Sequence, residues 1–169
     1  DDRRDWRDNR RAGGKWPPST RTSKRPGAGT IPTYRRHDGS VFVALVKGVS
    51  SWEGISGRFG FPKGRREDGD DTPENTAARE TFQETGLSGR VGPLVFRHMT
   101  DTYYHLPLGR QAREPHMREH GNGRQEIASH HWVPLRHLHT FVQERSGECN
   151  AGLREFVRRH LDDFMHRMR

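Results

Sequence analysis

The amino-acid sequence predicts a layered α/β domain, in which short strands surround one helix and a second helix follows them. Three observations predict this fold class: strand-like apolar runs between residues 30 and 133, a well-capped helix after Thr72, and a helical apolar stripe after Leu153. With 169 residues, the chain suits one ordinary domain. No apolar run approaches about 18 residues, which excludes a transmembrane helix. The single Cys149 excludes an internal disulfide framework.

The strands can be placed individually. Residues 30–36 and 41–47 have strand character, and the turn residues 37–40 between them predict a hairpin. Residues 52–61 predict short extended pieces interrupted by glycine, and residues 91–98, 102–106 and 127–133 predict further strands. The polar, Gly/Pro-rich residues 107–125 predict an exposed insert.

Both helices have clear local determinants. Thr72 supplies a capping side chain, Pro73 suits a first helical turn, and Gly86 suits a left-handed C-cap, so a helix is expected from residue 73 to about residue 85. The second helix is expected over residues 153–168, where six side chains form one apolar stripe: Leu153, Phe156, Val157, Leu161, Phe164 and Met168.

Positive charge is concentrated at the start of the chain. Residues 1–36 carry 11 Lys+Arg against four Asp, which accounts for +7 of the formal net charge of +8. Residues 1–30 have too few apolar side chains to offset the entropy of ordering, so we expect a flexible basic arm over 1–30. Two interpretations stay open: a solvated linker, or an arm that binds RNA through arginines and through stacking of Trp6 and Trp16.

The first helix carries the residues most informative about chemistry. Glu80 and Glu84 are four residues apart and therefore share one helix face with Gln83. Two stacked carboxylates repel each other unless a cation lies in front of them, and oxygen ligands of this kind suit Mg²⁺ or Mn²⁺. A solvated acidic helix face is the competing interpretation.

The loop before this helix adds two features. Its glycines, Gly64 among them, allow the backbone to approach a cation and to supply a carbonyl ligand. Lys63 and either Arg65 or Arg66 are placed to meet phosphate oxygens.

From Gly64 to Leu87 the sequence resembles the Nudix hydrolase signature, G-x5-E-x7-R-E-U-x-E-E-x-G-U. The matching residues are Gly64, Arg79, Glu80, Glu84, Gly86 and Leu87. The resemblance implies an α/β/α sandwich with a mixed sheet over residues 31–169, which hydrolyses a nucleoside diphosphate linked to another moiety with the help of a divalent metal. It also implies that Glu80 and Glu84 are metal ligands and that Arg79 orients a glutamate.

The sequence departs from this signature in three places. The spacing from Gly64 to Arg79 is one residue too long, so either Asp70 or Asp71 stands for the acid that precedes the helix. Thr81 replaces an aliphatic residue. Gln83 replaces a glutamate that, by this resemblance, would be a metal ligand. The amide oxygen of Gln83 can coordinate a cation but brings no negative charge. We therefore expect weaker metal binding and slower turnover, unless another acid compensates.

A second cluster lies downstream. Glu126 precedes Trp132-Val133-Pro134 by about the distance seen in the Nudix fold, where such a glutamate reaches the metal or acts as general base. The combination with Phe61-Pro62-Lys63-Gly64 is most similar to messenger-RNA decapping enzymes and, in part, to bacterial RNA pyrophosphohydrolases. By this resemblance Glu126 is the base that deprotonates a water molecule acidified by the cation.

Other basic and histidine residues are weaker candidates. Arg58, His105, Arg35 and Arg36 are further candidates for phosphate or RNA contacts. No His-Glu-x-x-His or Cys/His spacing exists, so the 11 histidines do not predict a metal site.

Together these features predict a Nudix pyrophosphohydrolase that acts on the 5′ end of RNA, triphosphorylated or capped, with Mg²⁺ or Mn²⁺ as cofactor. Two alternatives stay open: a non-catalytic RNA- or nucleotide-binding subunit, favoured by Gln83, and a hydrolase of small nucleotides or dinucleoside polyphosphates. The composition is also similar to that of kinetoplastid Nudix factors that stabilise edited mitochondrial mRNA. That resemblance implies an intracellular, mitochondrial location and membership of a larger RNA-processing complex.

Overall fold

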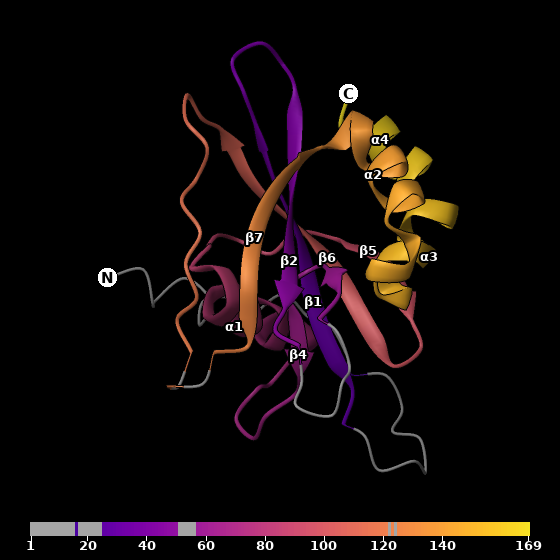
Figure 1. Cartoon of the computed structure of the whole chain (residues 1–169). Coiled ribbons are helices and arrows are strands. Elements are labelled where there is room, and N and C mark those ends of the chain that lie inside the picture. Colours follow the sequence, from indigo (N-terminus) through magenta and orange to yellow (C-terminus); the bar gives the residue numbers. More distant parts are fainter. Residues whose placement is uncertain (1–15, 17–24, 51–56, 122, 124) are drawn as a thin grey trace.

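The structure is a computed structural model that describes residue 16 and residues 25–50, 57–121, 123 and 125–169 (Figure 1). Most of the expected arm, residues 1–15 and 17–24, lies outside the described residues, and so do residues 51–56 of the glycine-interrupted stretch.

The described residues form one sheet and a set of short helices. The strands are β1 (Gly27–Arg35), β2 (Val41–Gly48), β3 (Phe59–Gly60), β4 (Lys63–Arg65), β5 (Leu94–His98), β6 (Asp101–Arg110) and β7 (Ile127–Pro134). The helices are α1 (Pro73–Thr85), α2 (Leu138–Glu144), α3 (Ala151–Arg159) and α4 (Leu161–Arg167), with 3-10 turns at Leu135–His137 and Ser146–Glu148. No helix among the described residues is long and apolar enough to cross a membrane.

Strand β1 is the centre of the sheet and makes it mixed. It runs parallel to β6, with Ile31 opposite His105, and antiparallel to β2, with Thr33 opposite Val43. On the edge that faces β2, the first residues of β1 pair with β4 rather than with β2, which places Gly64 opposite Ala28. The sheet order is β3-β2-β1-β6-β5, and β7 adds to β2.

Helices cover both faces of this sheet, as the α/β/α sandwich requires (Figure 1). Ala77 and Ala78 of α1 pack on one face in a cluster with Ala28 and Leu106. On the other face a larger core joins sheet residues to α2, α3 and α4. Its fully buried members include Ile31, Val43, Leu45, Leu138, Leu153 and Phe156. The sequence-based fold class is therefore confirmed.

The strands lie close to their predicted positions, but several of them begin or end at other residues. The hairpin turn is present: the Arg36 N–H donates to the Ser40 carbonyl at 2.9 Å, and Gly39 has φ 90°. Strand β1 starts at Gly27, so the last residues of the expected arm belong to the sheet. Strand β6 continues through Arg110, because pairing with β1 extends beyond the apolar residues, and it includes the start of the expected insert.

The C-terminal helix differs from its prediction. Residues 153–168 form two helices, α3 and α4, with a break at His160, whose ring lies 5.2 Å from that of Phe96. Backbone hydrogen bonds still cross the break, from the His160 N–H to the Phe156 carbonyl and from the Phe164 N–H to the His160 carbonyl. The apolar stripe therefore keeps one face against the sheet.

Candidate active site

Helix α1 is fixed at both ends by its own sequence. The Thr72 side chain accepts a hydrogen bond from the Asn75 N–H at 3.2 Å, and Pro73 lies in the first turn. Gly86 adopts the left-handed conformation, with φ 74°, and its N–H donates to the Phe82 carbonyl. These caps keep the helix regular, so Glu80 and Glu84 lie one turn apart on one face.

The buried Arg79 ties this helix to the preceding loop. Its guanidinium donates to Asp70 from Nη2 at 2.9 Å and from Nε at 3.2 Å, and to the Arg65 carbonyl at 2.9 Å. Asp70 also accepts from the Thr76 hydroxyl at 2.6 Å and from the Glu67 N–H at 2.9 Å. Burial alone would raise the pKa of Asp70, but these bonds outweigh it and lower the pKa.

Of the two aspartates that the sequence left open, Asp70 is therefore the acid that meets Arg79. The Asp70 side chain is 5% exposed, whereas Asp71 is exposed. Asp70 stands six residues after Gly64, as in the signature, so the extra residue lies after Asp70. Thr81 is buried too, and its hydroxyl lies 2.6 Å from that of Thr30 on β1, which explains how a polar residue occupies this aliphatic position.

Glu80 lies between Arg79 and Gly64. Its Oε1 accepts from Arg79 Nη1 at 2.8 Å. Burial raises the pKa of Glu80, and Arg79 offsets part of that shift. A Cβ at Gly64 would overlap the Glu80 carboxylate. The absence of a side chain at Gly64 therefore makes the space in which Glu80 lies, and it brings the backbone of β4 beside the carboxylate.

Glu84 is the centre of a carboxylate cluster. Burial raises the pKa of Glu84 well above its usual value, and the neighbouring charge of Glu80 raises it further. The Lys63 backbone N–H opposes the shift by donating to Glu84 Oε1 at 3.1 Å. The charges of Glu126 and Glu119 act in the same direction as Glu80. We call Glu80, Glu84, Glu119 and Glu126 the carboxylate cluster, because the charges of the other three each raise the pKa of Glu84.

This donor set fits a divalent cation. Burial and neighbouring acids raise the pKa of Glu80 and of Glu84, and a hard cation stabilises the ionised form of such carboxylates. Within the described residues, no three acidic, histidine or cysteine side chains already surround a common point. Gln83 is on the same stretch of α1, and its backbone carbonyl accepts from the His120 N–H at 2.6 Å.

Glu126 and Glu119 reach the cluster from the connection between β6 and β7. Glu126 is exposed and directly precedes β7, where its carbonyl accepts from the Val49 N–H at 2.9 Å. The sequence does not single out Glu119 as a site residue. Nothing local distinguishes it from Glu114 in the same polar segment, and only the path of the chain across α1 brings it to the site.

Three of the residues predicted to contact phosphate have partners of their own. Lys63 Nζ is 2.9 Å from Asp101 Oδ2. Burial alone would lower the pKa of Lys63, but the pKa is raised because Tyr103 and Asp101 stabilise the charged ammonium. Arg65 is exposed on β4 and donates to the Arg25 carbonyl at 2.9 Å, and Arg58 donates to the Gly147 carbonyl at 2.9 Å.

Arg35 and Arg36 are not brought to the cluster. They lie at the far end of β1, about 26 Å from Gly27 at ~3.3 Å per strand residue. Arg35 donates to the Gly39 carbonyl, and the Arg36 guanidinium lies 4.2 Å from the Phe42 ring centre. Their predicted contact with the substrate could therefore be made only by a long chain such as RNA.

The two histidines of β7 face opposite sides of the sheet, as alternation in a strand requires. His130 Nε2–H donates to the Glu84 carbonyl at 2.6 Å, on the α1 side. The His131 ring lies 5.2 Å from that of Phe59, on the other side. Burial lowers the pKa of His131 and so favours its neutral form.

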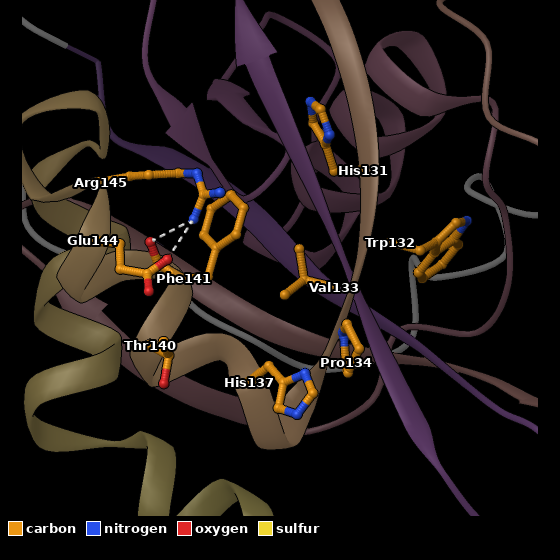
Figure 2. A pocket seen from close by; sticks show the side chains of 9 residues that line it. All are labelled: His131, Trp132, Val133, Pro134, His137, Thr140, Phe141, Glu144 and Arg145. Atoms are coloured by element: carbon orange, nitrogen blue, oxygen red, sulfur yellow. Dashed lines mark hydrogen bonds and ion pairs between the residues drawn. The ribbon is translucent and has the colours of Figure 1, made fainter.

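An open groove of about 630 Å³ lies between β7 and α2 (Figure 2). It is lined by aromatic, histidine and charged side chains together with a valine, a proline and a threonine: His131, Trp132, Val133, Pro134, His137, Thr140, Phe141, Glu144 and Arg145. The Arg145 guanidinium lies 4.3 Å from the Phe141 ring centre and 3.6 Å from the Glu144 carboxylate. Planar rings beside charged hydrogen-bonding groups suit a nucleobase.

Comparisons with known proteins give a consistent result. A family model described as NUDIX domain matches residues 23–153. Among solved structures, the Nudix hydrolase RenU from M. smegmatis is 18% identical, with a TM-score of 0.60 over 86% of this chain and 88% of that one. An Ap4A hydrolase from C. elegans is 16% identical, with a TM-score of 0.57 over 83% of this chain and 96% of that one. A MutT protein from Methanosarcina mazei is 17% identical, with a TM-score of 0.52 over the same shares. No curated protein matches the sequence significantly. At these identities the solved structures show a shared fold, and the match over residues 23–153 shows the family: the chain belongs to the Nudix family.

Proposed function

We propose that this chain hydrolyses a phosphoanhydride at the 5′ end of RNA, using a divalent metal. The observation that carries the proposal is the carboxylate cluster, in which burial and neighbouring charges raise the pKa of Glu84. A buried carboxylate with a raised pKa destabilises the metal-free fold when it is ionised at neutral pH. A bound cation would offset that cost.

The residues of the cluster have separate roles in this proposal. A divalent cation, when bound, would acidify water and offset the charge of the phosphates. Glu80, Glu84, the Gly64 carbonyl and the amide oxygen of Gln83 would hold it. Arg79 keeps Glu80 oriented through the 2.8 Å ion pair, and Glu126, an exposed member of the cluster, would accept the proton from water.

The choice of RNA rests on charge around the loop that bears Lys63. Arg25, Arg65 and Arg66 are exposed there, and the Arg66 guanidinium lies 5.1 Å from the ring centre of Trp16. Through this contact Trp16, a residue of the expected basic arm, lies beside the loop that bears Lys63. A polyanion longer than a nucleotide can use such a path, with electrostatic affinity that depends on salt.

A second candidate, a non-catalytic RNA- or nucleotide-binding subunit, is favoured by Gln83. The amide removes one negative charge from the face that Glu80 and Glu84 share, so metal affinity is lower than with glutamate. A subunit of this kind would bind RNA or a nucleotide at the same site without hydrolysing it.

One assay separates the candidates. The protein and its Gln83→Glu variant are incubated with 5′-triphosphorylated RNA, with capped RNA, and with free nucleotides and Ap4A, in Mg²⁺ or Mn²⁺. Gln143→Glu, on the exposed face of α2, is the matched control because it adds the same charge away from the cluster. We expect release of pyrophosphate or of the cap from RNA, faster with Gln83→Glu and unchanged with Gln143→Glu.

The other outcomes are equally specific. RNA binding without hydrolysis by either form would support the binding subunit. Preference for free nucleotides or Ap4A would replace RNA with a small-molecule substrate. Acceleration by both added glutamates would show that Gln83 has no particular place at the metal.

The contribution of the basic arm to RNA binding can be tested separately. Because β1 begins at Gly27, removal of residues 1–24 leaves the sheet complete. We expect weaker RNA binding at low salt, a smaller slope of log K against log salt by roughly 0.7 for each lost phosphate contact, and unchanged turnover of short nucleotides. An unchanged slope would leave the segment as a linker.

We also propose an intracellular, mitochondrial location and membership of a larger RNA-processing complex. Both proposals rest on the composition alone, and purification of the tagged chain from fractionated cells tests them together. Recovery outside the mitochondrial fraction, or as a single chain, would refute the corresponding proposal.

A further inference from the structure

The connection from β6 to β7 crosses the C-terminal half of α1. We call residues 111–121 of this connection the strap. Its Arg118 N–H donates to the Thr85 carbonyl at 2.8 Å, and its His120 N–H donates to the Gln83 carbonyl at 2.6 Å. These bonds satisfy carbonyls that the end of an α-helix leaves unpaired. The strap is thus attached to the same helix that carries the carboxylate cluster.

Side chains fasten the strap further. The His120 ring stacks on that of Phe82, with centres 4.8 Å apart and planes at 28°. At the other end of the strap, the Trp132 indole N–H donates to the Pro115 carbonyl at 2.9 Å. The segment between these two attachments includes Glu119, whose position is therefore fixed relative to both α1 and β7.

Glu119 uses its carboxylate to hold the start of β7. Oε2 accepts the Glu126 N–H at 2.9 Å, and both oxygens lie 3.3 Å from the Ile127 nitrogen, whose N–H they accept. On the opposite side, the Val49 N–H donates to the Glu126 carbonyl at 2.9 Å. The backbone of Glu126 is therefore held from both sides, although its side chain is exposed.

We propose that Glu119 is a positioning residue for Glu126. Its carboxylate fixes the backbone of Glu126, and the strap ties that backbone to α1. The inference rests on the function proposed above, in which Glu126 accepts the proton from water. A carboxylate suits the task, because a charged acceptor bonds two adjacent N–H groups more strongly than a neutral one.

The first test measures the hydrogen bonds without any activity. Amide hydrogen exchange is followed at Glu126 and Ile127 in the full chain, in Glu119→Ala and in Glu114→Ala, an exposed acid of the same strap. We expect faster exchange of these two amides in Glu119→Ala only. Unchanged exchange in Glu119→Ala would overturn the proposal.

The second test measures the effect on hydrolysis, in whichever of the natural chain and Gln83→Glu is more active. Loss of a partner that orients a site residue typically lowers activity by about 10- to 100-fold. We expect Glu119→Ala to lower kcat by that factor and to change KM by less than about two-fold, because the lost bond orients a base and does not touch the substrate. Glu119→Gln keeps one acceptor oxygen and should recover part of kcat.

A double-mutant cycle identifies the residue through which Glu119 acts. If Glu119 works through Glu126, then adding Glu119→Ala to Glu126→Ala changes kcat by less than about two-fold. Equal losses in the presence and absence of Glu126 would show a general structural role and overturn the proposal. A chain that hydrolyses nothing in either background would count against the function, while the exchange rates would still decide whether Glu119 holds the start of β7.

Discussion

Replacement of Asp70 by asparagine removes the charge that faces the buried Arg79 while keeping the shape of the side chain. Asp70 accepts two bonds from Arg79, at 2.9 and 3.2 Å, one from Thr76 at 2.6 Å and one from the Glu67 N–H at 2.9 Å. An amide keeps one of these acceptor oxygens and turns an NH₂ group toward donors. The variant therefore leaves a buried guanidinium short of a partner.

The expected loss follows from these contacts. Removing one partner of a buried ion pair costs about 3–5 kcal/mol. Arg79 keeps Glu80 at 2.8 Å and the exposed Glu67 at 3.4 Å, which favours the lower end of that range. With an m-value of ~2 kcal/mol/M, about 3 kcal/mol lowers the urea midpoint by roughly 1.5 M. Asp71→Asn, at the exposed neighbouring position, should change stability by no more than about 0.5 kcal/mol.

The same pair of variants predicts a pH dependence. Hydrogen bonds hold the pKa of Asp70 below its usual value, so its contribution is complete above the unfolded pKa of about 3.9 and is lost as the pH falls through the lower folded pKa. Urea unfolding, followed by circular dichroism from pH 7 to pH 3, should show a constant difference between the natural chain and Asp70→Asn down to about pH 4. Equal losses from Asp70→Asn and Asp71→Asn, or a loss below about 1 kcal/mol from Asp70→Asn, would refute the placement of Asp70.

Three further predictions concern other parts of the molecule. Gly64→Ala displaces the Glu80 carboxylate, and a displacement of this size should lower hydrolysis by about 100-fold in steady-state assays with little change in the circular dichroism spectrum; full activity would contradict the close packing. Glu84→Gln removes a carboxylate whose pKa burial raises, so the metal-free protein should melt about 2–4 °C higher by calorimetry and should no longer be stabilised by Mn²⁺; a lower melting temperature would contradict this. Burial lowers the pKa of His105 to about 4, so its protonation favours the unfolded chain and stability should fall by about 3 kcal/mol between pH 6.5 and pH 4. His105→Gln, which can still bond to Thr33, should abolish that fall in urea titrations; an unchanged fall would assign it to other groups.

Much of the fold was predictable because its determinants are local. Thr72, Pro73 and Gly86 specify where α1 begins and ends through backbone groups within a few residues of them. The strands of the hairpin follow from alternation and a turn with a glycine at positive φ. Helix α2 was not predicted, since its seven residues have no side-chain cap and their apolar spacing is too short to be distinctive.

Of the site, only the part carried by α1 could be predicted from the sequence. The i,i+4 spacing of Glu80 and Glu84 determines that they share a helix face, whatever the rest of the chain does. Asp70 and Asp71 are neighbours with the same chemistry, and the choice between them depends on how the loop closes over Arg79. Glu119 joins the site because the strap crosses α1, which no spacing in the sequence records.

The sequence by itself therefore determined the helix, its caps, the carboxylate spacing and the uneven charge, because each depends on residues less than about two helical turns apart or on composition. Only the tertiary structure decided which aspartate meets Arg79, that Lys63 pairs with Asp101, and that Arg35 and Arg36 lie at the other end of β1. These outcomes depend on strand pairing and loop closure between distant segments, where the energy of a contact is set by the burial and charge that the whole fold creates.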